Sequence, residues 1–161
     1  MTNSINNIKQ TPYEEILACN EGHLALTIAI DVSGSMNGPK LQTVIDGIER
    51  FKKANSSDPL TLKRVDVSIL TFGGDKVEVI QDWIPLVSFL EQPPLALKAG
   101  GQTPMGEAII RSIDLTSERN KLYYSIGCPA FIPMVMLITD GISSTSLDEA
   151  KQKLRKKTRA E

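Results

Sequence analysis

An apolar run that ends in small polar residues is the feature that most constrains the fold of this chain. His23–Ile30 (HLALTIAI) is nearly apolar on both faces, as a central strand of a parallel sheet should be. The turn-forming stretch DVSGSMNG follows directly, and Pro39 then opens an amphipathic helix that ends near Asn55. This succession of strand, polar loop and helix predicts the first unit of an α/β domain.

The remaining chain continues the same alternation. Two β-branched runs, Arg64–Phe72 and Lys76–Trp83, flank a glycine-rich hairpin turn at 73–75. Further along we expect an irregular or briefly helical stretch at 85–94, a helix at Met105–Leu115 with Pro104 at its first position, a buried strand at Pro133–Thr139 and a charged helix capped by Ser146 or Asp148. The order predicts an α/β fold with an antiparallel hairpin at one edge.

Length and composition indicate one globular domain. The chain has 161 residues, of which 41% are hydrophobic and 23% charged, enough for a single core. We expect a domain at 23–161 after an extension at 1–22 with a short helix through Ala18. The net charge of −1 argues against nucleic acid or an anionic membrane as the main partner, although the basic last helix leaves phosphate contact open. The polar N-terminus resembles no signal peptide, and two cysteines make no disulfide framework, so we expect a bacterial cytoplasmic protein.

Oxygen-bearing side chains gather where ligands bind in folds of this kind. Asp31 follows the first strand and Asp140 follows the fourth, and ligands of open α/β sheets sit beyond the carboxyl ends of strands. Ser33 and Ser35 alternate with Asp31 along one loop, and Thr103 adds a further hydroxyl. Such hard oxygen ligands select Mg²⁺, with Mn²⁺ or Ca²⁺ as alternatives, and a position left open could accept an acidic side chain of a partner.

These residues also carry a family resemblance. The pattern Asp31-x-Ser33-x-Ser35, a loop threonine at Thr103 and Asp140-Gly141 after a strand resembles the metal-ion-dependent adhesion site (MIDAS) of von Willebrand factor A domains. The strings DVSGSMNGPKLQTVIDGI, RVDVSILTFGG, GGQTPMGEAI and MVMLITDG are similar to a bacterial stand-alone subgroup associated with tellurium resistance and stress. The resemblance spans about Leu24 to Ile142.

The resemblance implies a fold and a function. It implies a Rossmann-like open sheet in the order 3-2-1-4, Mg²⁺ at its top and protein–protein recognition rather than catalysis. The loops around the metal should then set specificity, namely Met36, Asn37, Gly38, Gly101, Gln102, Gly141 and Ser143. The chain departs from the family in ending about twenty residues after the ITDG string, where the family usually continues through two more strands.

Three alternatives remain at this stage. The chain could be a scaffold that binds no metal. A haloacid-dehalogenase-like phosphatase would need a second aspartate where Ser33 stands, and a serine hydrolase would need to use the single histidine, His23.

If 133–139 is an edge strand, its apolar character predicts a cover, which the last helix, a second copy of the chain or a partner could supply.

Overall fold

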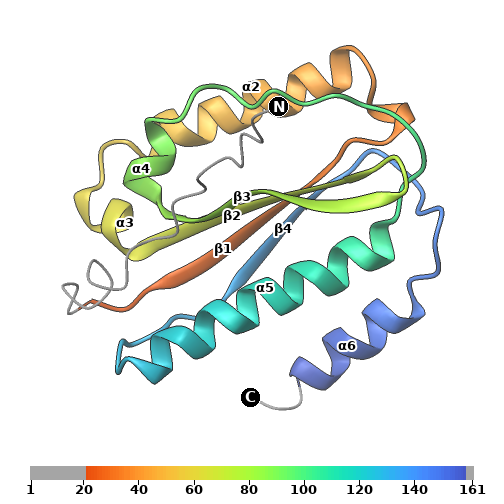
Figure 1. Cartoon of the computed structure of the whole chain (residues 1–161). Helices are drawn as coiled ribbons and strands as arrows, with labels where there is room; N and C mark the ends of the chain where they lie inside the picture. The colour runs from red at the N-terminus through yellow and green to blue at the C-terminus, as the bar shows by residue number, and fades with distance from the viewer. Residues whose placement is uncertain (1–20, 159–161) are drawn as a thin grey trace, which may run out of the picture.

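Four strands form one sheet in the order β3-β2-β1-β4 (Figure 1), in a computed structural model that describes residues 21–158. Strand β1 (Leu24–Asp31) lies between β2 (Val65–Gly73) and β4 (Met134–Ile138) and is parallel to both. Strand β3 (Lys76–Pro85) pairs antiparallel with β2 at one edge. The structure therefore confirms the expected α/β class, the strand order and the single antiparallel pair.

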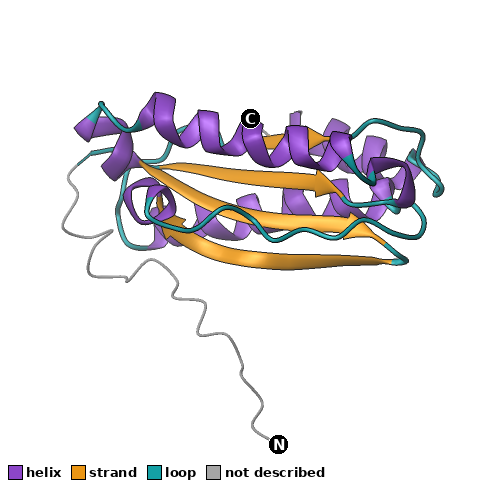
Figure 2. Cartoon of the chain, turned by 90° about the horizontal axis from the view of Figure 1, so that it is seen from above, coloured by secondary structure: helices purple, strands orange, loops and turns teal. Residues whose placement is uncertain are grey.

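Helices cover both faces of the sheet (Figures 1 and 2). They are the 3-10 turn η1 (Gly34–Met36), α2 (Pro39–Asn55), α3 (Pro59–Arg64), α4 (Leu86–Leu90), α5 (Met105–Ser125) and α6 (Asp148–Thr158). None of these helices has the length and apolarity needed to cross a membrane. The short helix expected before residue 19 lies outside the described residues.

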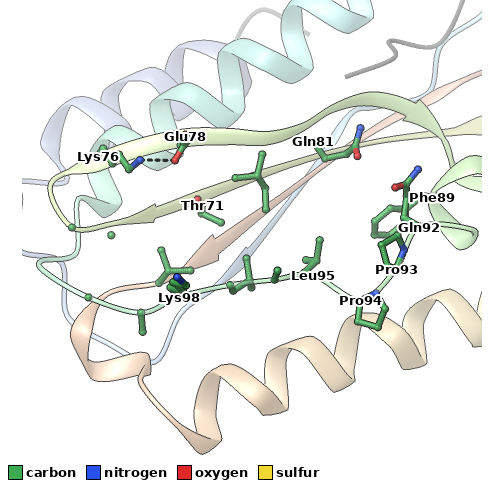
Figure 3. Close-up of a pocket in the computed structure, with 18 residues that line it drawn as sticks. Thr71, Lys76, Glu78, Gln81, Phe89, Gln92, Pro93, Pro94, Leu95 and Lys98 are labelled. Atoms are coloured by element: carbon green, nitrogen blue, oxygen red, sulfur yellow. Dashed lines mark ion pairs between the residues drawn. The ribbon is translucent and has the colours of Figure 1, made fainter. Parts of the chain in front are cut away.

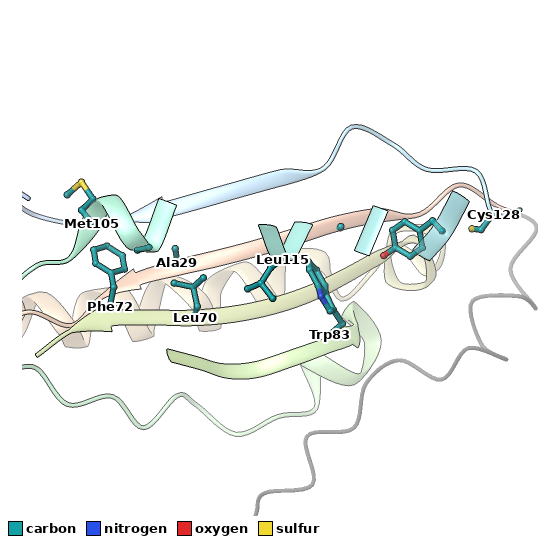
Figure 4. Close-up of a cluster of buried hydrophobic side chains, with 10 residues drawn as sticks. Ala29, Leu70, Phe72, Trp83, Met105, Leu115 and Cys128 are labelled. Carbon is teal, nitrogen blue, oxygen red and sulfur yellow. The ribbon is translucent and has the colours of Figure 1, made fainter. Parts of the chain in front are cut away.

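The two faces of β1 explain why its sequence is nearly all apolar. Ala25 and Ala29 face the core beneath α5, where Phe72 and Met105 also lie (Figure 4). Leu26, Ile28 and Ile30 face a second core with Ile48 of α2 and Phe89 of α4. A strand with a packed layer on each side needs apolar residues at every position, as the sequence predicted.

Two helices differ from the expectation. Helix α5 ends at Ser125 rather than at Leu115. Its buried hydroxyl groups find hydrogen-bond acceptors within the helix, because Ser112 and Thr116 donate to backbone carbonyls one turn earlier, at 2.7 and 2.9 Å. Helix α3 was not predicted. It begins with Pro59, after Asp58, whose carboxylate accepts the N–H of Leu60 at 3.0 Å.

Strand β4 is exposed, which corrects its interpretation as a buried strand. Among residues 21–158, β4 pairs with β1 alone, so its other edge carries no strand. The side chains of Met134, Val135 and Met136 are exposed. Helix α6 lies beside α5 (Figure 1) and is joined to it by the Lys153–Asp114 ion pair, so it does not cover that edge by strand pairing.

Candidate metal centre

The proposed metal ligands come together at the carboxyl ends of β1 and β4. A pocket of about 500 Å³ opens there. Its lining includes Ser33 and Ser35 from the loop after β1, Thr103 from the loop before α5, and Asp140 from the turn after β4. Three segments far apart in the sequence thus contribute oxygen atoms to one cavity. Asp31, the last residue of β1, is fully buried and does not line the pocket.

The spacing of the pocket oxygens suits a small octahedral cation. Ser33 Oγ lies 3.2 Å from Ser35 Oγ, and the Ser35 hydroxyl donates to Asp140 Oδ1 at 2.9 Å. Neighbouring ligands of an octahedral Mg²⁺ shell, each about 2.1 Å from the ion, are separated by about 3 Å. The donors in the pocket are mostly hydroxyls, from Ser33, Ser35 and Thr103, with one carboxylate from Asp140. These are the oxygen donors typical of hard-cation sites.

Asp31 organises the loop from beneath. Its Oδ1 accepts the backbone N–H of Ser33 at 2.8 Å, and its Oδ2 accepts the hydroxyl of Thr139 at 2.6 Å. Both carboxylate oxygens are therefore engaged in holding neighbouring segments. Thr139 was not identified from the sequence, although it stands directly before Asp140.

Backbone hydrogen bonds fix the three segments against one another. Gly34 N–H donates to the Gly101 carbonyl at 2.9 Å, which ties the loop after β1 to the loop before α5. Thr103 N–H donates to Ser144 Oγ at 3.0 Å, and Ser144 N–H donates to the Thr103 carbonyl, also at 3.0 Å. Across residues 21–158 the Thr103 hydroxyl has no hydrogen-bond partner, which leaves it available to a ligand in the pocket.

Lys40 is a charged residue of this pocket that the sequence analysis missed. Its ammonium donates to Asp140 Oδ2, while Ser35 occupies Oδ1 of the same carboxylate. The hydrogen bond from Lys40, followed by that from Ser35, lowers the pKa of Asp140 below its ordinary value. Asp140 is therefore a carboxylate at neutral pH, as a metal ligand should be.

The loops expected to contact a partner are mostly at the surface. Asn37, Gly38, Gly101, Gln102 and Gly141 are exposed, and Ser143 is half-buried.

Met36 is the exception, because its side chain is only 2% exposed and packs beneath η1. Its assignment to the partner surface is therefore wrong. Ile142, which was not predicted, lines the pocket with 93% exposure. The sequence does indicate exposure of Ile142, since this isoleucine stands in a glycine- and serine-rich turn rather than in a strand or helix.

A larger pocket of about 780 Å³ adjoins this centre (Figure 3). It lies between the β2–β3 hairpin, which contributes Thr71 and Glu78, and the extended segment at 92–100. Gly100 lines it, and the next residue, Gly101, lines the smaller pocket. The two cavities therefore share one loop.

Residues 26–142 match the model of the von Willebrand factor type A domain. The match covers well over half of the chain, and the chain therefore belongs to this family. Domains of the family often carry metal-dependent adhesion sites, and they are generally interaction modules rather than enzymes. Comparison with curated proteins found no match.

Solved structures share the fold at low sequence identity. The von Willebrand domain of the type V pili tip protein Mfa5 from Porphyromonas gingivalis is 18% identical over 76% of this chain and 39% of its own, with a TM-score of 0.55. The open pilus adhesin SpaC from Lactobacillus rhamnosus GG is 16% identical over 78% of this chain and 16% of its own, with a TM-score of 0.58. Proximal thread matrix protein 1 from mussel byssus, with a zinc-occupied MIDAS motif, is 18% identical over 86% and 34%, with a TM-score of 0.55. The chain thus spans well under half of each of these proteins.

Proposed function

We propose that this domain binds a divalent cation, with Mg²⁺ as the first candidate, and through it an acidic side chain of a partner protein. The residues of the proposed centre are Ser33, Ser35, Thr103 and Asp140, which line the pocket, and Asp31 beneath them. The observation that carries the proposal is the oxygen spacing in the pocket, 3.2 Å between the two serine hydroxyls and 2.9 Å from Ser35 to Asp140. Both separations are close to that of adjacent ligands around an octahedral ion.

Each residue has a distinct part in this arrangement. Ser33, Ser35, Thr103 and Asp140 line the pocket and would hold the ion, directly or through water. Asp31 holds the Ser33 backbone in place and adds negative charge from beneath. When bound, the cation supplies an electrophilic centre with a position for a carboxylate. No covalent bond changes in this function, so we propose no catalytic activity.

The geometry gives an enzyme little support. His23 lies at the amino end of β1, beside Asp66, and the pocket lies at the opposite, carboxyl end of that strand. His23 therefore cannot act as a base for Ser33 or Ser35. No second aspartate stands at position 33 to serve as the acid–base group of a phosphatase.

We propose Mg²⁺ rather than zinc because the pocket offers hydroxyls and carboxylates, the ligands of hard cations. The mussel protein holds zinc in its MIDAS motif, which makes zinc the competitor to include in any titration. We also assign the domain to the subgroup associated with tellurium resistance and stress in the bacterial cytoplasm. That assignment is supported by the strings around the metal ligands, such as GGQTPMGEAI and MVMLITDG.

A second contact surface is proposed at the outer edge of β4. Its exposed Met134, Val135 and Met136 follow an exposed Phe131 and Ile132, so apolar surface coincides with a strand edge that no strand within residues 21–158 pairs with. Natural sheets rarely leave such an edge bare. We propose that a second copy of the chain pairs with it, since identical edges can pair antiparallel across a twofold axis.

The primary experiment is calorimetric titration of Mg²⁺, Mn²⁺ and Zn²⁺ into chelator-stripped protein. Asp140→Asn removes one charge without changing side-chain size, and we expect it to lose most of the Mg²⁺ and Mn²⁺ affinity. Asp46→Asn is the matched control, because Asp46 is an exposed carboxylate on α2 outside the pocket. Wild-type affinity in Asp140→Asn would place the metal elsewhere. Absence of binding in the wild type would contradict the proposal.

A further inference from the structure

We infer that Lys40 is a specificity-determining residue of this centre, whose ammonium weakens binding of the cation and strengthens binding of an acidic group to the cation-loaded pocket. The inference rests on the proposed function and deepens it. It concerns a residue that the family resemblance did not bring into the metal site.

Lys40 competes directly for a proposed metal ligand. It is the second residue of α2, and its ammonium reaches across the pocket to Asp140 Oδ2. Ser35 occupies Oδ1, so both oxygens of Asp140 are held by the chain's own donors. A cation that takes Asp140 as a ligand must displace at least one of them. Displacement of Lys40 is possible without disturbing α2, because its side chain is 58% exposed and has no other ion pair within residues 21–158.

The second effect of Lys40 is on the net charge of the pocket. Among residues 21–158, Lys40 and Asp140 are the only ionisable residues that line the pocket, and Asp31 lies beneath it. Two carboxylates and one ammonium sum to −2 + 1 = −1, and a divalent ion brings this to +1. A single carboxylate from a partner then makes the assembly neutral. Without Lys40 the loaded pocket is already neutral, and an incoming carboxylate would leave it at −1.

The size of the effect follows from Coulomb's law. An ammonium that remains exposed at about 6 Å from a divalent ion, in a water-like dielectric, repels it enough to raise the Kd about tenfold. The attraction of the same ammonium for a singly charged carboxylate at a similar distance is about half as large, which corresponds to a change of about threefold. The two effects have opposite signs, and a change in folding or loop position would not produce that combination.

The test compares Lys40→Met with two other variants. Lys40→Arg keeps the charge, and Lys53→Met removes an exposed charge from the same helix, outside the pocket. Mn²⁺ is titrated calorimetrically into each chelator-stripped protein. Acetate is then titrated into the Mn²⁺-loaded proteins, with acetamide as its uncharged control. Binding is followed through the relaxation rate of water protons, which the bound Mn²⁺ enhances.

We expect Lys40→Met to bind Mn²⁺ about tenfold more tightly and acetate about threefold more weakly than the wild type, while Lys53→Met and Lys40→Arg match the wild type. Equal Mn²⁺ affinity in wild type and Lys40→Met would overturn the inference and leave the proposed function standing. A parallel loss of both affinities would overturn it too, because it would indicate a structural role. Failure of every protein to bind Mn²⁺ would overturn both the proposed function and the inference.

Discussion

The hydroxyl of Thr139 donates to Asp31 Oδ2 at 2.6 Å, across the ends of two neighbouring parallel strands. The same Thr139 oxygen accepts the backbone N–H of Gly141 at 3.2 Å. One side chain therefore connects the buried carboxylate at the end of β1 to the turn that carries Asp140. The relative position of the two carboxylates depends on this link.

Replacement of Thr139 should weaken cation binding at the proposed centre, although none of its five proposed residues is replaced. Thr139→Val keeps the shape but removes the hydroxyl, which leaves a buried carboxylate oxygen of Asp31 without its donor. Loss of a residue that orients a metal ligand typically costs about 10–100-fold in affinity, and we expect a Mn²⁺ Kd raised by that amount in calorimetry. Thr139→Ser keeps the hydroxyl and should bind nearly as the wild type does. Equal Kd values for the valine and serine variants would contradict this role.

Gly101 should tolerate no side chain. Its φ of +68° lies in the left-handed region, and a Cβ there would stand 2.3 Å from the Cα of Gly74. The conformation alone costs a non-glycine residue about 1–2 kcal/mol, and the backbone contact adds to that. We expect Gly101→Ala to lower the free energy of unfolding in urea by more than 1–2 kcal/mol, as an order-of-magnitude estimate.

Gly100 supplies the control for that measurement. It is the preceding residue in the same loop, has no positive φ and would place a Cβ in open space. Gly100→Ala should therefore leave the unfolding midpoint nearly unchanged. Similar losses for the two variants would mean that the loop, rather than the approach of Gly101 to Gly74, is sensitive to substitution.

A buried ion network at the opposite end of the sheet should govern acid stability. Asp66 Oδ2 accepts hydrogen bonds from Arg119 Nη2 at 2.8 Å and from Tyr123 Oη at 2.5 Å, and His23 Nδ1 lies 3.6 Å away. Burial alone would raise the pKa of Asp66, but His23, Arg119 and Tyr123 together lower it below its ordinary 3.8. Because the folded pKa is depressed, Asp66 stabilises the fold fully above the unfolded pKa, and this stabilisation is lost as pH falls through the folded value.

Asp66→Asn should therefore remove stability and part of its acid dependence. It leaves the Arg119 guanidinium buried without its counter-charge, which typically costs about 3–5 kcal/mol. Urea unfolding at pH 7 and at a series of lower pH values measures both effects. The double variant Asp66→Asn, Arg119→Met should regain much of the loss, since it removes the unpaired charge as well. A double variant as unstable as the single one would contradict this account.

Two of the proposed metal ligands, Asp31 and Asp140, could be placed at the same end of the sheet from the sequence, because each follows a strand that is itself easy to recognise. Asp31 ends a nearly apolar run and Asp140 follows another, and the carboxyl ends of parallel strands lie at the same end of a sheet. Lys40 and Thr139 could not be found in this way. They contact residues 100 and 108 positions away, and nothing local distinguishes a lysine in a first helical turn or a threonine after a strand.

Asp66 illustrates a second limit of prediction from the sequence, which concerns the burial of charged residues. In RVDVSILTF it occupies a polar position of an alternating strand, which predicts exposure. The structure buries it completely, because Arg119 and Tyr123 reach it from a part of α5 that the sequence did not predict to be helical. Burial of a carboxylate depends on a partner that compensates its charge. The sequence prediction ended the helix at Leu115, so it did not bring Arg119 and Tyr123 to Asp66.

The exposed edge of β4 gives the last prediction. If a second copy pairs with this edge, a charge placed on it should keep the chains apart, because charged side chains on edge strands oppose edge-to-edge association. Met134 is 51% exposed on β4, and Leu60 is 43% exposed on α3, which contacts β2 and β3 at the other side of the sheet. We expect sedimentation velocity over a range of concentrations to show self-association of the wild type and of Leu60→Lys, and a monomer for Met134→Lys. A wild type that stays monomeric at every concentration would refute pairing through this edge, and the apolar edge strand would then have to be soluble without a second copy.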